Sequence, residues 1–431
     1  MGYGHLRAAH AVAAVTALPL VYADEPPIAD AGDARAWARA RAAYERISRT
    51  SQLPVVGGPF RAVLDGLTAI PHLHPDRDLS RPHLGVRILH RAIERGLGSG
   101  LVRELRAHRA GLVTTFYAPA LVADHHGIDD ILCIVTDADV NRIWAPREPR
   151  ETRIRYAAPT QRVQRRLIAY GVPPDRIEVT GFPLPVALLG DHTLHLARDH
   201  LARRLVRLDP TGAFLDEHGH DIEQLLGCAL PERVVNEPLH IVFAIGGAGA
   251  QTALVGPLVR GVKPGILRGE LRLTLVAGIR PRVRDHLFDA LAHAGLAARL
   301  GAGVEVLYTP LLTDYLQQFN AVLARADVLW TKPSELTFFG ALGLPLVLAP
   351  PMGVHERYNR RWARECGVAV TQRELGHASE WLSELARDGT LAAAAWSGFI
   401  RMPKSGLFRI AERLARAPTV VRMVTPASET A

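Results

Sequence analysis

Polar side chains follow an apolar run in the C-terminal half of the chain. The run DVLW, residues 327–330, is typical of a buried strand, and Thr331-Lys332-Pro333-Ser334 comes directly after it. Pro333 suits the first turn of a helix, and Ser334 suits its N-cap. Because a helix N-terminus and a lysine both attract negative charge, this segment predicts a binding site for phosphate.

A second polar segment follows the next apolar run, residues 344–351. After a Pro-Pro-Met-Gly loop the chain presents His355, Glu356 and Asn359. The carboxyl ends of neighbouring parallel strands meet at one edge of a sheet, so the two polar segments are expected to lie together. The alternative is that these side chains only cap a helix and form surface ion pairs.

A glycine-rich turn precedes both segments in the chain. Gly246, Gly247 and Gly249 follow the apolar run that begins at residue 239. Glycine lets the backbone approach a ligand closely, and a helix N-terminus at such a point favours phosphate. A tight turn that binds nothing is the alternative interpretation.

Two residues of the N-terminal half have the chemistry of a proton acceptor. His5 follows a Gly-x-Gly turn at the start of an alanine-rich helix, and Asp137 comes after the apolar run ILCIVT. An imidazole or a carboxylate within about 3 Å of a hydroxyl group can remove its proton. Asp139 is a second carboxylate in this segment, and we interpret it as a solvated residue at the end of the strand.

The N-terminal segment has a second interpretation. A charged start, a run rich in Ala, Val and Leu, and VYA before Asp24 are features of a secretory signal. His10 and Pro19 interrupt the apolar run, so we favour a turn that belongs after a buried strand. Only Met1 precedes this turn, and the sequence therefore predicts an N-terminal domain whose first strand is missing.

Apolar runs alternate with helical segments along most of the chain. Such alternation predicts an α/β fold with two open parallel sheets in tandem and a cleft between them. A segment rich in His, Arg and Leu interrupts the alternation, which suggests domains over 1–185 and 238–431 joined by a connector over 186–237. A helix is expected over 5–18. The expected strands lie within residues 18–23, 111–118, 131–139, 153–160, 176–185, 239–250, 271–278, 304–310, 327–334, 344–351 and 366–370.

The composition limits the class of protein. Hydrophobic residues make up 48% of the 431 residues, which is enough for large cores. No apolar run reaches the ~18 residues that a membrane-spanning helix requires. Cys133, Cys228 and Cys366 are scattered, which favours neither a zinc site nor a disulfide framework and indicates a reducing compartment such as the cytoplasm.

Positive charge is concentrated in one segment. The net charge is +8, and residues 81–109 contain seven arginines against Glu94 and Glu104. Aromatic residues do not alternate with these arginines, so nucleic acid is not expected as a partner. Leu84, Ile88 and other apolar residues between the arginines allow an amphipathic helix at an anionic membrane surface. The alternative is a helix that packs on the first sheet with its arginines solvated.

The sequence resembles a group of glycosyltransferases in five motifs that occur in the same order. The motifs are GYGHLRAA, VTDADVNRIW, YGVPPDRIEVTGFPLP, FAIGGAGA, and ADVLWTKPSELT with the later HERYN. They are similar to those of the processive diacylglycerol glucosyltransferases and monogalactosyldiacylglycerol synthases, and more distantly to those of the peptidoglycan N-acetylglucosaminyltransferase. The motifs extend from residue 2 to about residue 360. The resemblance implies a GT-B fold, in which two Rossmann-like domains face a cleft and the C-terminal one holds a nucleotide-sugar.

The resemblance also implies a role for each motif residue. Asp137 or His5, on the acceptor side, would remove the proton of the acceptor, and the backbone at Leu307 and Tyr308 would contact the uracil. The implied nucleotide-binding residues are Gly246, Gly247, Gly249, Tyr308, Lys332, Ser334, Glu335 and Thr337. The implied donor-sugar-binding residues are His355, Glu356 and Asn359.

The implied reaction transfers a sugar from a UDP-sugar to a lipid or another hydroxyl acceptor with inversion. It requires no metal and no cofactor besides the donor, because a helix N-terminus and a cation can stabilise the departing diphosphate. Such an enzyme would be cytoplasmic, and its lipid-modifying form would lie peripherally on the inner face of the plasma membrane.

One position departs from the family pattern in a way that concerns nucleotide affinity. The family has a glutamate that grips the ribose, and this sequence has Gly340 there. Glu335 is the nearby carboxylate that could reach the ribose instead. In two further departures, His355 replaces a glutamine and Asn141 replaces a histidine. Two alternatives therefore stay open: a non-catalytic relative that binds a nucleotide or a partner, and a UDP-sugar 2-epimerase, which shares this architecture.

Overall fold

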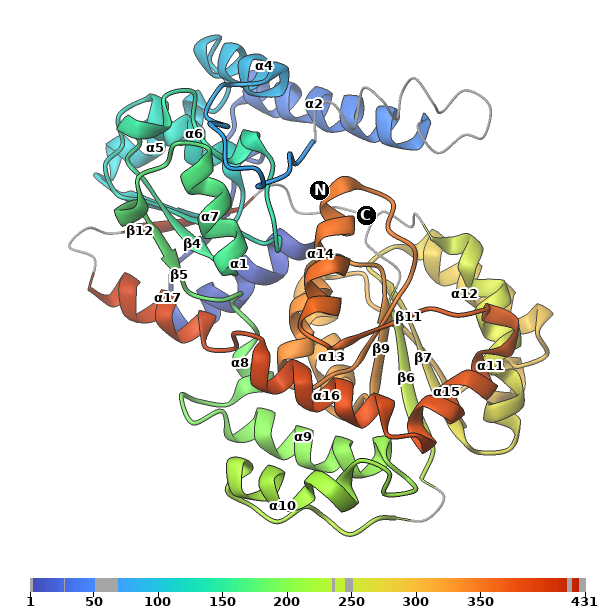
Figure 1. Cartoon of the computed structure of the whole chain (residues 1–431). Coiled ribbons are helices and arrows are strands. Elements are labelled where there is room, and N and C mark those ends of the chain that lie inside the picture. The colour runs from blue at the N-terminus through green and yellow to red at the C-terminus, as the bar shows by residue number, and fades with distance from the viewer. Residues whose placement is uncertain are drawn as a thin grey trace.

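Figure 1 shows a computed structural model of the chain, in which two parallel sheets are flanked by helices. The structure describes residues 3–26, 28–50, 69–234, 237–244, 251–416 and 421–425. Each sheet has six strands, and the paired strands are parallel in both. The predicted α/β fold with two parallel sheets is confirmed.

The N-terminal sheet, sheet A, has the strand order β1-β12-β2-β3-β4-β5. Its inner strands are short apolar runs, and every residue of β2 and β3 is buried. Parallel strands that carry helices on both faces have this character, because neither face meets water. The strands are β1 (Leu20–Tyr22), β2 (Gly111–Thr114), β3 (Ile131–Ile134), β4 (Ile154–Ala158), β5 (Ile177–Val179) and β12 (Val421–Thr425).

Strand β12 comes from the far end of the sequence and lies inside sheet A. It runs parallel to β1, with Leu20 opposite Met423, and parallel to β2, with Gly111 opposite Val421. Helix α1 packs against it. The sequence predicted that the first strand of this sheet is missing. In the part of the chain that the structure describes, the position between β1 and β2 is occupied by β12, which comes from the C-terminal end of the sequence. The apolar run VVRMV was a signal for this strand that the sequence analysis did not use.

The C-terminal sheet, sheet B, has the strand order β11-β10-β9-β6-β7-β8. All six residues of β6 are buried between its neighbours β7 and β9. The strand expected over 366–370 begins later, at Ala369, because Cys366 still caps the preceding helix. The strands are β6 (Leu239–Ala244), β7 (Leu271–Gly278), β8 (Val304–Tyr308), β9 (Val328–Thr331), β10 (Leu346–Leu348) and β11 (Ala369–Thr371).

Helices cover both sheets and connect their strands. Those of the N-terminal half are α1 (Tyr3–Thr16), α2 (Ala31–Thr50), α4 (Leu84–Glu94), α5 (Ser99–Ala107), α6 (Tyr117–His125) and α7 (Gln161–Ala169). The later ones are α8 (Val186–Leu189), α9 (His195–Leu208), α10 (Leu215–Leu226), α11 (Val255–Leu267), α12 (Pro281–His293), α13 (Leu312–Arg325), α14 (Val354–Glu365), α15 (Ala378–Arg387), α16 (Thr390–Arg401) and α17 (Gly406–Ala415). Short 3-10 helices are η1 (Arg142–Trp144), η2 (Pro149–Glu151), η3 (Pro174–Arg176), η4 (Thr252–Leu254), η5 (Ala297–Arg299), η6 (Glu335–Leu342) and η7 (Leu375–His377).

The segment expected as a connector forms helices that lie on the C-terminal half, at the lower edge of Figure 1. Arg204 of α9 is buried, and it donates hydrogen bonds to the carbonyl oxygens of Ala326 at 2.7 Å and Leu342 at 3.0 Å. Arg207 forms an ion pair with Asp327 at 2.6 Å. These contacts anchor α9, a helix of the predicted connector, to the C-terminal half. Strand β12, which lies within the predicted C-terminal domain, pairs instead with sheet A. The domain limits at residues 185 and 238 remain predictions.

Helix α1 holds the N-terminal half against the C-terminal half. Tyr3 and Leu6 belong to the same buried cluster as the strands of sheet B. Arg7 is buried as well, with its guanidinium 4.6 Å from the centre of the Phe319 ring and a hydrogen bond of 3.2 Å to the Tyr315 hydroxyl. His5, predicted to follow a Gly-x-Gly turn, instead lies in the first turn of α1, since the helix already begins at Tyr3. It is therefore held at the boundary between the two sheets.

Candidate active site at the junction of the two halves

The predicted site residues from both halves meet where α1, the loop after β3, η6 and α14 come together. We call this region the junction. It includes His5 and Asp137 from the N-terminal half, and Glu335 and Asn359 from the C-terminal half. Asp137 and Glu335 follow the carboxyl ends of β3 and β9, whereas His5 lies in α1 and Asn359 in α14.

His5 is held in one tautomer. Its Nδ1 lies 2.7 Å from the carbonyl oxygen of Thr115, and a carbonyl oxygen only accepts, so Nδ1 carries the proton. Thr115 in turn donates its hydroxyl to the carbonyl oxygen of His5 at 2.9 Å. In the neutral ring the basic lone pair is then on Nε2, which none of the hydrogen bonds found among the described residues engages. A histidine in this state can accept a proton at Nε2.

The charges around His5 act in opposite directions on its protonation. Burial of the ring lowers the pKa of His5, and the carboxylates of Asp137 and Glu335 raise it in part. The net direction is downward, so the ring is neutral at pH 7 and able to accept a proton. The two carboxylates lie close enough to stabilise the imidazolium ion once it forms.

Asp137 and Asp139 have different environments although they are two residues apart. Asp137 is partly exposed and accepts a hydrogen bond of 3.2 Å from the side-chain amide of Asn359. Asp139 is fully buried and binds Arg166 through both oxygens, each at 2.9 Å, and Arg162 at 2.9 Å. The interpretation of Asp139 as a solvated residue is therefore wrong, because two arginines bury and neutralise it.

Lys332 and Glu356 form an ion pair in which Glu356 is buried and Lys332 is largely buried. The Lys332 ammonium lies 2.9 Å from Glu356 Oε1, and Oε2 of the same carboxylate accepts a hydrogen bond of 2.8 Å from the backbone N–H of Met352. Burial opposes the charge on Glu356, but the Lys332 ammonium and His355 outweigh it and hold the pKa of this carboxyl below its ordinary value. The pair ties the loop after β9 to the first turn of α14.

Glu335 faces the N-terminal half. Its side chain lies against the backbone of Gly4, where an added Cβ would come within 2.9 Å of Glu335 Cβ. Its carboxylate is 3.9 Å from Nε of the buried Arg7. A glycine at position 4 is therefore required for this close approach, and the carboxylate of Glu335 is brought beside Arg7 of the N-terminal half.

Position 340 cannot supply the missing ribose contact. Gly340 is buried in η6, and an added Cβ would lie 2.8 Å from Val368 and 3.0 Å from the sulfur of Met402. A glutamate there would point into the packed core.

The remaining residues predicted to bind the nucleotide-sugar lie in different environments, and three of them are outside the described part of the chain. Gly246, Gly247 and Gly249 lie outside the described residues. Ser334 is the N-cap of η6, but its side chain makes no capping hydrogen bond. Thr337 is buried and its hydroxyl has no hydrogen-bond partner among the described residues. His355 is partly exposed. The ring of Tyr308 is covered by the Arg284 guanidinium, 4.7 Å from the ring centre.

Sequence reasoning missed two partners of the predicted base. Thr115 fixes Nδ1 of His5, and the hydroxyl of Thr136 lies 3.1 Å from the same nitrogen. Both threonines directly follow the apolar runs GLVT and ILCIV, so polar residues at two strand ends were the available signal. The burial of Arg7 had no signal in the sequence.

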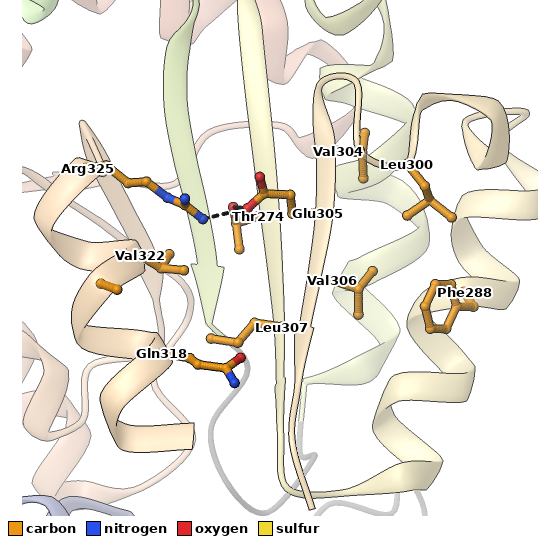
Figure 2. Close-up of a pocket in the computed structure, with 12 residues that line it drawn as sticks. Thr274, Phe288, Leu300, Val304, Glu305, Val306, Leu307, Gln318, Val322 and Arg325 are labelled. Atoms are coloured by element: carbon orange, nitrogen blue, oxygen red, sulfur yellow. Dashed lines mark hydrogen bonds and ion pairs between the residues drawn. The ribbon is translucent and has the colours of Figure 1, made fainter. Parts of the chain in front are cut away.

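A pocket of about 550 Å³ lies away from the junction, along the edge strand β8 (Figure 2). Glu305 and Arg325 form an ion pair of 2.8 Å in its wall, and Val306 and Phe288 line its other side. Leu307 is the one sequence-predicted contact residue that lines it. None of the predicted proton acceptors reaches this pocket.

The segment over residues 81–109 forms α4 and α5 near the top of Figure 1. On α4 Val86 and Ile93 are buried, whereas Leu84 is 63% exposed and Ile88 is 52% exposed. The apolar residues thus divide between the core and an outer face. In the part of the chain that the structure describes, no helix combines the length and apolar character needed to cross a bilayer. Likewise, no group of three or more His, Cys, Asp and Glu side chains gathers there as a metal site.

No protein-family model matches the sequence, and no curated protein matches it significantly. The structure is similar to that of a UDP-GlcNAc 2-epimerase from Neisseria meningitidis bound to UDP-GlcNAc, with 14% identity, a TM-score of 0.45, and 79% of this chain and 84% of that chain covered. It is also similar to MurG of Acinetobacter baumannii, with 13% identity, a TM-score of 0.43, and 80% and 82% covered. A glycosyltransferase from Rickettsia africae ESF-5 has 11% identity, a TM-score of 0.38, and 84% and 89% covered. All three TM-scores are below 0.5, so these likenesses carry no conclusion about activity.

Proposed function

We propose that this protein is an inverting glycosyltransferase that uses a UDP-sugar, with the acceptor bound at the junction. The supporting observation is His5, whose Nδ1 is fixed on the Thr115 carbonyl, whose Nε2 remains basic, and beside which Asp137 carries a negative charge. A transferase of this kind requires one proton acceptor beside the attacking hydroxyl group.

In the proposed reaction the acceptor hydroxyl attacks the anomeric carbon of the donor. Its proton moves to Nε2 of His5, the new C–O bond forms, and the bond from the anomeric carbon to the diphosphate breaks with release of UDP. Asp137 stabilises the imidazolium ion that results. Attack on the face opposite the diphosphate inverts the anomeric configuration.

On the donor side we propose that the nucleotide binds to the residues inferred from the family motifs and that His355 and Glu356 hold the sugar. The diphosphate would lie near Lys332, Ser334 and Thr337. Because the Glu335 carboxylate faces Arg7 of the N-terminal half, we assign it no contact with the ribose. Because Glu356 already neutralises Lys332, the charge of the diphosphate would depend on backbone N–H groups as well. Metal independence belongs to the same proposal.

The proposal is tested with the full-length protein and a panel of donors. Isothermal titration with UDP is expected to give binding, and release of UDP from UDP-glucose, UDP-galactose or UDP-GlcNAc is expected when detergent micelles that contain diacylglycerol are added. No binding at millimolar UDP would contradict the proposal and leave the non-catalytic alternative.

A UDP-sugar 2-epimerase is the second candidate, and the position of Glu335 favours it. Epimerisation at C2 requires several acid–base groups around the donor sugar, and Glu335 adds a carboxylate from the C-terminal half beside His5. The two reactions can be told apart by the fate of the hydrogen at C2 of the donor sugar. In D₂O an epimerase incorporates deuterium at C2 of UDP-GlcNAc, which ¹H NMR detects, and a transferase leaves C2–H intact.

The lipid acceptor and the membrane surface form a separate part of the proposal, supported by α4. Exposed Leu84 and Ile88 share the outer face of α4 with the exposed Arg87 and Arg91. Each arginine at an anionic surface contributes about 1 kcal/mol, and salt screens this attraction. Co-sedimentation is therefore expected with anionic vesicles at low salt and not with neutral ones. Absence from both pellets would indicate an acceptor in solution and a cytoplasmic enzyme.

A further inference from the structure

Asn359 joins the two halves through a single side-chain amide. Its Oδ1 accepts a hydrogen bond of 2.8 Å from the backbone N–H of Ala138. Its Nδ2 donates at 3.2 Å to Asp137 Oδ1 and at 3.2 Å to the carbonyl oxygen of Pro333. The backbone N–H of Ala138 can only donate, so the orientation of the amide is determined. Both N–H donors of this fully buried amide are therefore used between the loops after β3 and β9.

The neighbours of Asn359 on α14 reinforce this connection. The Tyr358 hydroxyl donates a hydrogen bond of 3.0 Å to the carbonyl oxygen of Ile70. The Arg162 guanidinium lies 5.5 Å from the centre of the Tyr358 ring and 4.0 Å from the Glu365 carboxylate. Three residues of α14, Tyr358, Asn359 and Glu365, thus contact the N-terminal half. The same helix carries His355 and Glu356, the residues proposed to hold the donor sugar.

We infer that Asn359 is a positioning residue that couples the docking of α14 on the N-terminal half to the orientation of Asp137. The inference rests on the proposed function, in which Asp137 stabilises the protonated base. While α14 is docked, the amide fixes the Asp137 carboxylate and the backbone at Ala138. When the halves separate, Asp137 loses this donor, so proton transfer is confined to the docked arrangement.

This role differs from a contact to the donor sugar, the role implied by the family motif. A sugar contact would leave one N–H of the amide for a hydroxyl of the donor, and loss of that contact would mainly raise the KM for the UDP-sugar. A positioning residue that acts on Asp137 changes kcat instead. A displaced catalytic group lowers the rate by about 10²-fold.

The first test measures hydrogen exchange and requires no substrate. In Asn359→Ala the backbone amide of Ala138 is expected to exchange at least tenfold faster than in the wild type. His355→Ala is the matched control on the same helix, and its Ala138 amide is expected to exchange at the wild-type rate. In Asn359→Asp the carboxylate still accepts from Ala138, so that amide is expected to stay protected. Unchanged exchange in Asn359→Ala would overturn the inference.

The second test measures turnover of the UDP-sugar that the donor panel identifies. Asn359→Ala is expected to lower kcat about 10²-fold with little change in KM. In Asn359→Asp two carboxylates face each other, and the loss in kcat is expected to be at least as large although Ala138 stays protected. A raised KM with unchanged kcat would overturn the inference in favour of a sugar contact. If Asp137→Asn has wild-type kcat, the proposed role of Asp137 is wrong. The hydrogen bond between Ala138 and Asn359 is then judged by the exchange result alone.

Discussion

The two sides of the junction use their charged side chains differently. On the N-terminal side Nε2 of His5 keeps a lone pair for a proton, and Asp137 is partly exposed. On the C-terminal side Lys332 and Glu356 neutralise each other, and Asn359 uses its amide on protein groups. The N-terminal side thus has a histidine able to accept a proton, whereas these three C-terminal side chains bind protein groups and support the junction.

The two aspartates of one loop repeat this difference at shorter range. Asp139 is bound by two arginines and contributes to folding, whereas Asp137 faces the junction and is available to a reacting group. The two residues are of the same type and lie only two positions apart in the sequence. The surrounding cations decide which carboxylate is structural.

The largest expected change in stability follows substitution of Asp139. In Asp139→Asn the buried Arg166 loses its counter-charge, and breaking a buried pair from one side costs about 3–5 kcal/mol. Urea denaturation of this variant is expected to show that loss in the free energy of unfolding. Asp137→Asn is the matched control and is expected to lose less than about 1 kcal/mol. Equal losses in the two variants would remove the distinction between these carboxylates.

A smaller loss of stability is expected when the ion pair on the C-terminal side is broken. In Glu356→Gln the ammonium of Lys332 remains without its counter-charge in a largely buried position, and the free energy of unfolding is expected to fall by about 2 kcal/mol. Removal of both charges in Lys332→Met, Glu356→Leu is expected to recover most of this loss. A double variant no more stable than Glu356→Gln would show that the pair is not the support described here.

A pH-dependent loss of stability is expected from His240, which lies in β6 far from the junction. Burial lowers the pKa of His240 to about 4 from 6.5, so the folded state disfavours its charged form. The unfolded chain then binds more protons between these values, and stability that is present above pH 6.5 is lost as the pH falls. The loss is about 2 kcal/mol at pH 5 for this group alone.

Urea denaturation at pH 7.5 and pH 5.0 checks this prediction. The difference in the free energy of unfolding between the two pH values is expected to shrink by about 2 kcal/mol in His240→Gln. His218→Gln, on the exposed side of α10, is the control and is expected to keep the wild-type difference. If the difference in the free energy of unfolding between the two pH values is the same in His240→Gln as in the wild type, the account of His240 is wrong. The experiment also shows how much of any loss of activity in acid is caused by unfolding and not by protonation of His5.

Much of the fold follows from the sequence because parallel strands buried on both faces are continuous apolar runs. The runs ILCI and LHIVFA could be recognised alone, and they form β3 and β6. The partnership of β12 with β1 and β2 could not be predicted in this way, since pairing across the whole chain leaves no local pattern. The same limit explains the site. His5 and Asp137 could be found by type, but the burial of Asp139 depends on Arg166, which lies one helix later.

The most direct test of the central claim is the turnover of His5→Gln with the UDP-sugar that the wild type uses. We expect kcat to fall by about 10²–10⁴-fold while the affinity for UDP stays unchanged, because glutamine cannot accept the proton. Because burial lowers the pKa of His5, wild-type activity is expected to decline only below pH 6.5, and His5→Gln is expected to lose this acid limb. Turnover of His5→Gln at the wild-type rate, with the acid limb retained, would contradict the assignment of His5 as the proton acceptor.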